Sequence, residues 1–564
     1  MNHPLTLHVS PGGDDSAPGT SERPLATPEA ARQLLRHRRQ GRRDLSAVVR
    51  FAPGVYRLTT PLRLEADDGG DATSEVRYEA ERPGSVTLSG ARPLEWTREG
   101  DLCCCRFDDR PFARFFDGDR VIRRASSDYF RTLENFEDTR EIAVPVDAVE
   151  AVGGVDALRE SELVLLEHWA DVRLKLAGCR LEGKQALLRF DDEPGRIHFT
   201  RPFPQRRPGR SAYFDNVFHN PIQAGTFFLD RRAGTAYCCS DTHSSPDPRN
   251  SLAPFLETLL SIRGTPEEPV RGLHIAGIRF MHTNWHRPLD HGFINGQGGV
   301  YNLDADLDNN QWIARQPAAL YAEHADRLVV SQCCFEHAGA AGIDLHRGVS
   351  HSLVENCNFD NMAGCGIVLG VFSDPDIEMH TPYLPADHRE ICSDNLIRSN
   401  NIRRVGVDFH GSCGIAAGYP ARVVIADNTI EDVPYSAISL GWGWTSIPNA
   451  MRYNRITGNT IRRAMRLLYD GAAIYTLSRQ PGTRVDHNRI EDVQSSGLGR
   501  EDDKTPRAIY LDAASGGSLA EPFLVDHNLI ERVDVEAPIK TKSNGSYVIL
   551  KDNLNGAAPA KNAP

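Results

Sequence analysis

The sequence predicts an all-β protein: a right-handed parallel β-helix with an N-terminal cap and an inserted β-rich lobe. Two interleaved repeats in the second half, together with little 3.6-residue periodicity, indicate this solenoid. The first repeat has the form Asn-x-Ile, and its last five asparagines are 31, 29, 40 and 25 residues apart (Asn428, Asn459, Asn488, Asn528 and Asn553). The second repeat places Ile directly after Gly or Ala (Gly366, Gly414, Ala437, Ala473 and Ala508).

Both repeats have a physical explanation in stacked coils. Each coil carries short strands that direct an apolar residue inward, and polar turns separate the strands. Because asparagine tolerates the left-handed backbone that a tight corner needs, we expect the repeated asparagines at corners. Stacking should then align Ile on Ile and Asn on Asn. A β-propeller gives similar spacing, but no blade signature is present in the sequence.

The pattern divides the chain into four segments. Residues 1–93 form the N-terminal cap and first coils, with a helix expected at about 28–39. Residues 94–254 lack the repeat but contain strand-like runs such as "SELVLLEHW", which indicates an inserted β-rich domain. Residues 255–555 carry the repeat and form the main parallel β-helix, and residues 556–564 are expected to be disordered.

Charge and composition exclude several classes of function. The chain carries 64 Lys and Arg against 76 Asp and Glu, a net charge of −12, which disfavours nucleic acid as a partner. No run of 18 apolar residues is present, so we expect no membrane span. The N-terminus lacks the basic and apolar regions of a signal peptide, which favours a cytoplasmic location, or a secreted or periplasmic one if a leader was removed. Adjacent cysteines without a C-x-x-C motif indicate reduced thiols.

Several blocks, in order along most of the chain, resemble one group of enzymes. These blocks are "FAPGVYRLTTPLRL", "TFFLDRRAGTAYC", "GIRFMHTNW", "YSAISLGWGW", "LYDGAAIYTLSRQPGT" and "AIYLDAASGG". Together they resemble right-handed β-helix glycoside hydrolases, with family 141 closest and family 120 a relative. The resemblance implies a β-helix with an inserted lobe that cleaves a glycosidic bond in plant-type or complex glycans. Family 141 is associated with α-L-fucosidase and xylanase activities.

The resemblance implies that Asp470 and Asp512 are the catalytic carboxylates. Glycoside hydrolysis needs one carboxyl group as proton donor and a second as nucleophile or base. The family pattern Asp-Gly-Gly departs here at Ala472, and Asp-Glu-Gly-Ser departs at Ala513, which removes a carboxylate. If Ile474 aligns with Ile509, Asp470 precedes its Ile and Asp512 follows its Ile, so a corner must bring the two acids together.

Candidate substrate-binding residues surround this pair. Trp442 and Trp444 share one face of a strand, where exposed indoles stack on sugars. Tyr475 and Tyr510 follow the two inward Ile positions and should point outward. We also expect His337 and Asp344 to line the same groove. The histidine spacing does not suit a metal on a strand, so neither a metal nor a cofactor is predicted, and the expected partner is a carbohydrate.

Two other functions remain open at this stage. A polysaccharide lyase or epimerase on the same fold could use Lys540 and Lys542, which alternate on one strand. A non-catalytic glycan-binding β-helix would tolerate Ala513. The sugar, the linkage, the stereochemical outcome and the oligomeric state do not follow from the sequence.

Overall fold

The computed structural model describes most of the chain. It leaves out residues 1–3, 101, 108–109, 119, 220–221, 240–249, 374–376, 495, 499–504, 543–545 and 557–564. The predicted disordered tail, 556–564, therefore lies outside the described residues except for Gly556.

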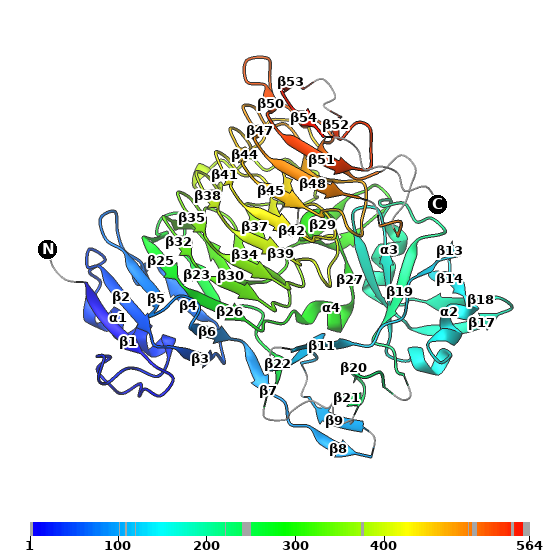
Figure 1. Cartoon of the computed structure of the whole chain (residues 1–564), viewed down its shortest axis with the longest axis horizontal. Coiled ribbons are helices and arrows are strands. Elements are labelled where there is room, and N and C mark those ends of the chain that lie inside the picture. Colours follow the sequence, from blue (N-terminus) through cyan, green and yellow to red (C-terminus); the bar gives the residue numbers. More distant parts are fainter. Residues whose placement is uncertain are drawn as a thin grey trace.

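Three parallel sheets run the length of the molecule, and each coil contributes one strand to each sheet in turn (Figure 1). In stacking order, sheet 1 is β1 (Leu5–Val9), β2 (Ala47–Phe51), β5 (Val76–Ala80), β25 (Leu273–Ala276), β32 (Val329–Ser331), β35 (Leu353–Glu355), β38 (Leu396–Arg398), β41 (Val424–Ala426), β44 (Arg455–Thr457), β47 (Arg484–Asp486), β50 (Phe523–Asp526) and β53 (Val548–Lys551). Sheet 2 is β3 (Gly54–Arg57), β6 (Val86–Ser89), β26 (Ile278–Met281), β33 (Cys334–Glu336), β36 (Asn358–Asp360), β39 (Asn401–Arg403), β42 (Thr429–Glu431), β45 (Thr460–Arg462), β48 (Arg489–Val493), β51 (Leu529–Val533) and β54 (Leu554–Asn555). Sheet 3 is β4 (Leu62–Glu65), β23 (Leu260–Arg263), β30 (Ala318–Glu323), β34 (Ala341–Leu345), β37 (Ile367–Leu369), β40 (Ile415–Ala417), β43 (Ile438–Leu440), β46 (Ala472–Thr476), β49 (Arg507–Leu511) and β52 (Ile539–Thr541). The predicted parallel β-helix is confirmed.

Like residues stack on like residues along the interior. In sheet 3, Ile438 pairs with Ile474 and Ile474 with Ile509, and all three side chains are buried. Each such side chain contributes about 1.5–3 kcal/mol of burial, and in-register stacking repeats this contribution from coil to coil. The predicted alignment of Ile on Ile is therefore confirmed.

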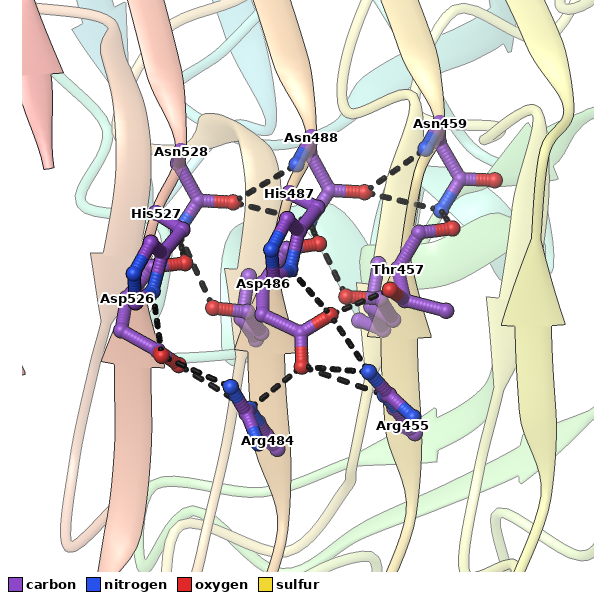
Figure 2. A network of polar contacts seen from close by, with 12 residues as sticks. Arg455, Thr457, Asn459, Arg484, Asp486, His487, Asn488, Asp526, His527 and Asn528 are labelled. Carbon is purple, nitrogen blue, oxygen red and sulfur yellow. Dashed lines mark hydrogen bonds and ion pairs between the residues drawn. The ribbon is translucent and has the colours of Figure 1, made fainter.

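Stacked asparagines form a second interior ladder. The amide oxygen of Asn488 accepts hydrogen bonds from the backbone N–H and the side-chain amide of Asn459, at 3.0 and 2.9 Å. Asn488 donates in turn to Asn528 at 2.9 Å (Figure 2). The predicted alignment of Asn on Asn is confirmed, but the predicted left-handed backbone at these asparagines is wrong. The preceding residue adopts it instead, as at His487 with φ 53° and His527 with φ 54°, because the asparagine side chain must turn inward.

Two insertions leave the coils at the same corner. Residues 90–259 separate β6 from β23, and residues 282–317 separate β26 from β30, so both depart between sheet 2 and sheet 3. Because successive coils stack, segments that leave at one corner lie on one side of the solenoid, as Figure 1 shows.

The first insertion consists mainly of antiparallel sheets. One contains β7 (Ala91–Pro93), β8 (Thr97–Glu99), β9 (Leu102–Arg106), β10 (Arg114–Asp117), β11 (Arg120–Arg124), β20 (Thr226–Asp230), β21 (Thr235–Cys239) and β22 (Ser251–Pro254). The others contain β12 (Phe130–Arg131), β15 (Glu162–Leu166), β16 (Asp171–Lys175) and β19 (Ser211–Asp215), and β13 (Glu134–Phe136), β14 (Glu141–Pro145), β17 (Gly178–Glu182) and β18 (Gln185–Arg189). The second insertion adds β27 (Phe293–Ile294), which pairs with β16, and the hairpin β28 (Tyr301–Ala305) and β29 (Gln311–Ala314). The two insertions therefore hold each other beside the coils.

The helices are short. They are α1 (Pro28–Arg39), α2 (Val146–Ala151), α3 (Glu193–Thr200) and α4 (His286–His291), and the expected helix at 28–39 is confirmed. Thr27 caps α1 by accepting a 3.1 Å hydrogen bond from the backbone N–H of Ala30. None of the described helices is long and apolar enough to cross a membrane.

Candidate active site

A pocket of about 280 Å³ lies over the outer face of sheet 3, near β43, β46 and β49. The lobe, the second insertion and the turns of the coils all contribute to its lining (Trp169, Arg201, Phe203, Asn295, Gly296, Gln297, Asn302, Asn309, Gln311, Met379, His380, Trp444, Asp470, Tyr475 and Asp512). Both predicted acids therefore line one pocket, together with Trp444 and Tyr475.

Asp470 stands at the corner before β46. Its backbone is left-handed, with φ 58°, which turns the chain sharply into the strand. Its Oδ2 lies 4.0 Å from Nδ1 of His168, a lobe residue whose other ring nitrogen contacts Arg210. The imidazole also stacks on Tyr469, with ring centroids 5.1 Å apart. The lobe therefore positions groups around this carboxylate.

Asp512 comes directly after β49. Its Oδ2 accepts a 2.7 Å hydrogen bond from the Tyr475 hydroxyl, and its Oδ1 accepts a 2.8 Å bond from the backbone N–H of Ala513. Nζ of Lys542 lies 3.4 Å from Oδ1. These three contacts hold the carboxylate of Asp512 in one orientation. Ala513, where the related pattern has Glu, supplies a backbone donor here and no second acid.

The two acids stand at opposite ends of neighbouring strands. Asp470 precedes β46 and Asp512 follows β49, while Ile474 and Ile509 pair in register between them. Five extended residues span about 16 Å, so the two acids reach the pocket from opposite strand ends of sheet 3. Both carboxylates act electrostatically on Lys540 and on Tyr510.

Of the predicted aromatic residues, two line the pocket and two do not. Trp442 is 1% exposed and packs edge-on against Phe372 at 5.2 Å, so its predicted stacking on a sugar is wrong. Gly443, with φ 93°, turns the chain between Trp442 and Trp444. Only Trp444 reaches the pocket, 5.3 Å from the His380 ring. Tyr475 and Tyr510 form a cluster separate from the coil interior, as predicted, but Tyr510 is buried outside the pocket.

Asp344 and His337 lie elsewhere, so their predicted place in this groove is wrong. Asp344 is 1% exposed and bound by the guanidinium of Arg315, with Nε 2.8 Å from Oδ2, at a distant part of sheet 3. Burial raises the pKa of Asp344, and Arg315 opposes that rise. His337 follows β33 of sheet 2 and packs against Phe116 at 5.4 Å. Both residues belong to a coil that lies several coils before those of Asp470 and Asp512.

Sequence analysis missed the residues that the insertions contribute. Trp169 and Arg201 come from the lobe, and Asn295 and Gln297 come from the second insertion. The Asn- and Gln-rich stretches "FINGQGG" and "DNNQW" were a usable signal, because amides suit sugar hydroxyls. Among the described residues, no group of three or more His, Cys, Asp or Glu side chains could hold a metal ion.

Comparisons with known proteins agree with this architecture. The family model "Right handed beta helix region" matches residues 291–382 and 350–505. The chain is a right-handed parallel β-helix. A solved structure titled "Glycoside hydrolase" is similar over 97% of this chain and 96% of that one, with 27% identity and a TM-score of 0.90.

Other solved structures are more distant. A complex of XylC with xylose has 13% identity and a TM-score of 0.43, covering 98% of this chain and 86% of that one. A GH136 lacto-N-biosidase from Eubacterium ramulus has 11% identity and a TM-score of 0.39, covering 98% of this chain and 68% of that one. A search of the curated proteins found no match.

Proposed function

We propose that this protein is a glycoside hydrolase that acts in the pocket over sheet 3. The proposal depends on one observation. Asp470 and Asp512 come from opposite strand ends of two adjacent coils, and both line one pocket. The near full-length similarity to a solved glycoside hydrolase supports it. The partner is then a carbohydrate.

The surroundings of the two acids suggest separate roles. Asp512, held by hydrogen bonds from Tyr475 and Ala513 and with Lys542 nearby, is the nucleophile or base. Asp470 is then the proton donor to the glycosidic oxygen, so that the bond from that oxygen to the anomeric carbon breaks as the proton arrives. Asp512 then attacks the anomeric carbon or activates a water molecule that attacks it, and either step completes the displacement.

The lining favours a neutral sugar. Trp444 offers an indole face, and the amides of Asn295, Gln297 and Gln311 can donate to and accept from hydroxyl groups. Arg201, the one arginine among the lining residues of the pocket, forms an ion pair with Glu167. An α-L-fucoside or a xylan, the substrates implied by the resemblance to family 141, has this chemistry.

A lyase is the second candidate, because two lysines stand beside the acids. Burial and the charge of Lys542 lower the pKa of Lys540, whose Nζ lies 4.6 Å from the centre of the Tyr510 ring. An amine with a lowered pKa can remove a proton, as β-elimination requires. That reaction needs a uronate substrate and gives an unsaturated product.

The deciding experiment is a screen with aryl α-L-fucosides, aryl xylosides, xylan and pectic oligosaccharides. Asp470→Asn and Asp512→Asn should each lower kcat by about a thousandfold or more, while Asp427→Asn, a matched change at another left-handed corner, should keep wild-type activity. NMR of the first product identifies its anomer and so distinguishes inversion from retention. Sugar release that survives both substitutions contradicts the site, and ultraviolet-absorbing products from pectic substrates favour the lyase.

A further inference from the structure

A second cavity, of about 110 Å³, lies where the lobe meets the coils. It shares no lining residue with the pocket at Asp470 and Asp512. One side comes from β10, β11, β16 and β19 of the lobe, and the other from the second insertion, which includes Asn284, and from a coil turn that includes Asp408. One water molecule needs roughly 10–15 Å³, so the cavity has room for a polyatomic guest.

The lining of this cavity carries more positive than negative charge. Four arginines face three carboxylates (Arg114, Arg123, Arg124 and Arg173; Glu162, Asp215 and Asp408). Arg124 and Arg173 share Asp215, at 2.7 and 2.6 Å. Glu162 also forms a 2.8 Å ion pair with Arg231, which lies outside the cavity lining. Since arginine stays protonated in proteins, the carboxylates do not balance the guanidinium groups.

Two guanidinium nitrogens at the cavity are buried without a partner among the described residues. These atoms are Nη1 of Arg114 and Nε of Arg173. Arg114 is only 2% exposed, and burial lowers its pKa although Asp408 raises it. A buried charged donor without an acceptor is unfavourable, because it has lost its hydrogen bonds to water. An acceptor oxygen inside the cavity would remove this cost.

Arg123 provides a route from solvent. Its side chain is 46% exposed and lines both the cavity and an adjoining open groove with Arg404 and Arg466. An anion attracted to these exposed arginines therefore meets the mouth of the cavity.

We propose that this cavity binds a small oxyanion, either a free inorganic anion such as phosphate or the carboxylate of an acidic sugar. The anion accepts hydrogen bonds from Arg114 and Arg173 and joins the lobe to the coils. A purely structural arginine cluster, by contrast, would bind nothing. The site is independent of the hydrolase proposal, because its ligand need not be cleaved.

Isothermal titration calorimetry of the full chain at fixed ionic strength tests the proposal. Sodium phosphate, sodium glucuronate or both should bind saturably, while glucose should not. Phosphate alone identifies a free inorganic anion, and glucuronate alone identifies a sugar carboxylate. Arg114→Lys and Arg123→Gln should each weaken binding about tenfold or more.

Arg120→Gln is the matched control. Arg120 lies on β11 like Arg123 and is equally exposed at 46%, but it pairs with Asp117 and does not line the cavity. The Arg120→Gln variant should bind the anion with the affinity of the wild-type protein. If Arg114→Lys fails to fold, Arg123→Gln decides the question. If neither phosphate nor glucuronate binds saturably, or if Arg120→Gln weakens binding as much as Arg123→Gln, the proposal is overturned.

Discussion

The hydroxyl of Tyr475 donates a 2.7 Å hydrogen bond to Oδ2 of Asp512. The bond links adjacent coils, because Tyr475 belongs to β46 and Asp512 follows β49. Burial and the charge of Asp512 raise the pKa of Tyr475 well above its ordinary value, so the phenol keeps its proton and remains a donor. Removing this donor tests how the carboxylate is oriented.

Tyr475→Phe keeps the buried ring and removes only the hydroxyl. We expect kcat on the best substrate of the screen to fall about 10- to 100-fold, because one hydrogen bond to a charged group is lost. KM should stay within about twofold of the wild-type value, since the ring still lines the pocket. Tyr453→Phe, at a tyrosine that is 47% exposed, is the control. An unchanged kcat would show that Tyr475 does not orient Asp512.

The neighbouring tryptophans should respond in opposite ways. Trp442→Ala empties a buried site and should lower the free energy of unfolding by about 3–5 kcal/mol. Trp444→Ala should leave that free energy near the wild-type value and raise KM about three- to tenfold through a lost ring contact. Urea unfolding and steady-state kinetics measure the two effects. A raised KM for Trp442→Ala in a fully stable protein would contradict the burial of that indole.

The asparagine ladder makes a prediction about stability. Asn488→Ala leaves the backbone N–H of Asn459 without its acceptor. It also removes three hydrogen bonds that the Asn488 amide donates, to Ile456, Asp486 and Asn528. We expect the free energy of unfolding to fall by about 3 kcal/mol or more, because buried polar groups lose their partners. Asn401→Ala removes an exposed asparagine of β39 and should change stability by less than about 0.5 kcal/mol. Equal losses in the two variants would refute the ladder's role.

His282 predicts a loss of stability in acid. Burial, followed by the charges of His337, Arg279 and Arg57, lowers its pKa from 6.5 to about 3. Below pH 6.5, His282 binds a proton in the unfolded chain but stays neutral in the folded chain. Its contribution to stability is therefore lost as the pH falls from about 6.5 toward 3. The slope approaches about 1.4 kcal/mol per pH unit.

His282→Asn should flatten this slope, since asparagine accepts the left-handed backbone at φ 62°. His351→Asn, at a left-handed histidine whose side chain is 61% exposed, should leave the slope as it is in the wild type. Urea unfolding between pH 7 and pH 4 measures both variants. A wild-type slope in His282→Asn would show that other groups cause the acid sensitivity.

The repeat alone was enough to predict how the coils stack. Ile474 on Ile509 and Asn488 on Asn528 follow from spacing, because stacked coils make each residue the neighbour of its counterpart one coil away. The same reasoning wrongly predicted a left-handed backbone at the repeated asparagines. The residue before each asparagine adopts that backbone instead, and this choice depends on where the asparagine side chain finds hydrogen-bond partners. The reasoning also failed at Trp442 because Gly443, in a left-handed conformation, redirects the chain between the two indoles.

The sequence by itself determined the solenoid and its inward residues, because these depend on contacts that repeat from one coil to the next. The two acids were predicted from the family resemblance and not from the repeat. Only the tertiary structure decided what surrounds those acids. His168 approaches Asp470, and Trp169 lines the same pocket, because two insertions leave at one corner and fold back over sheet 3. No periodic pattern encodes contacts between segments separated by about three hundred residues. They arise from where the lobe docks, which depends on surfaces that exist only after the coils have formed.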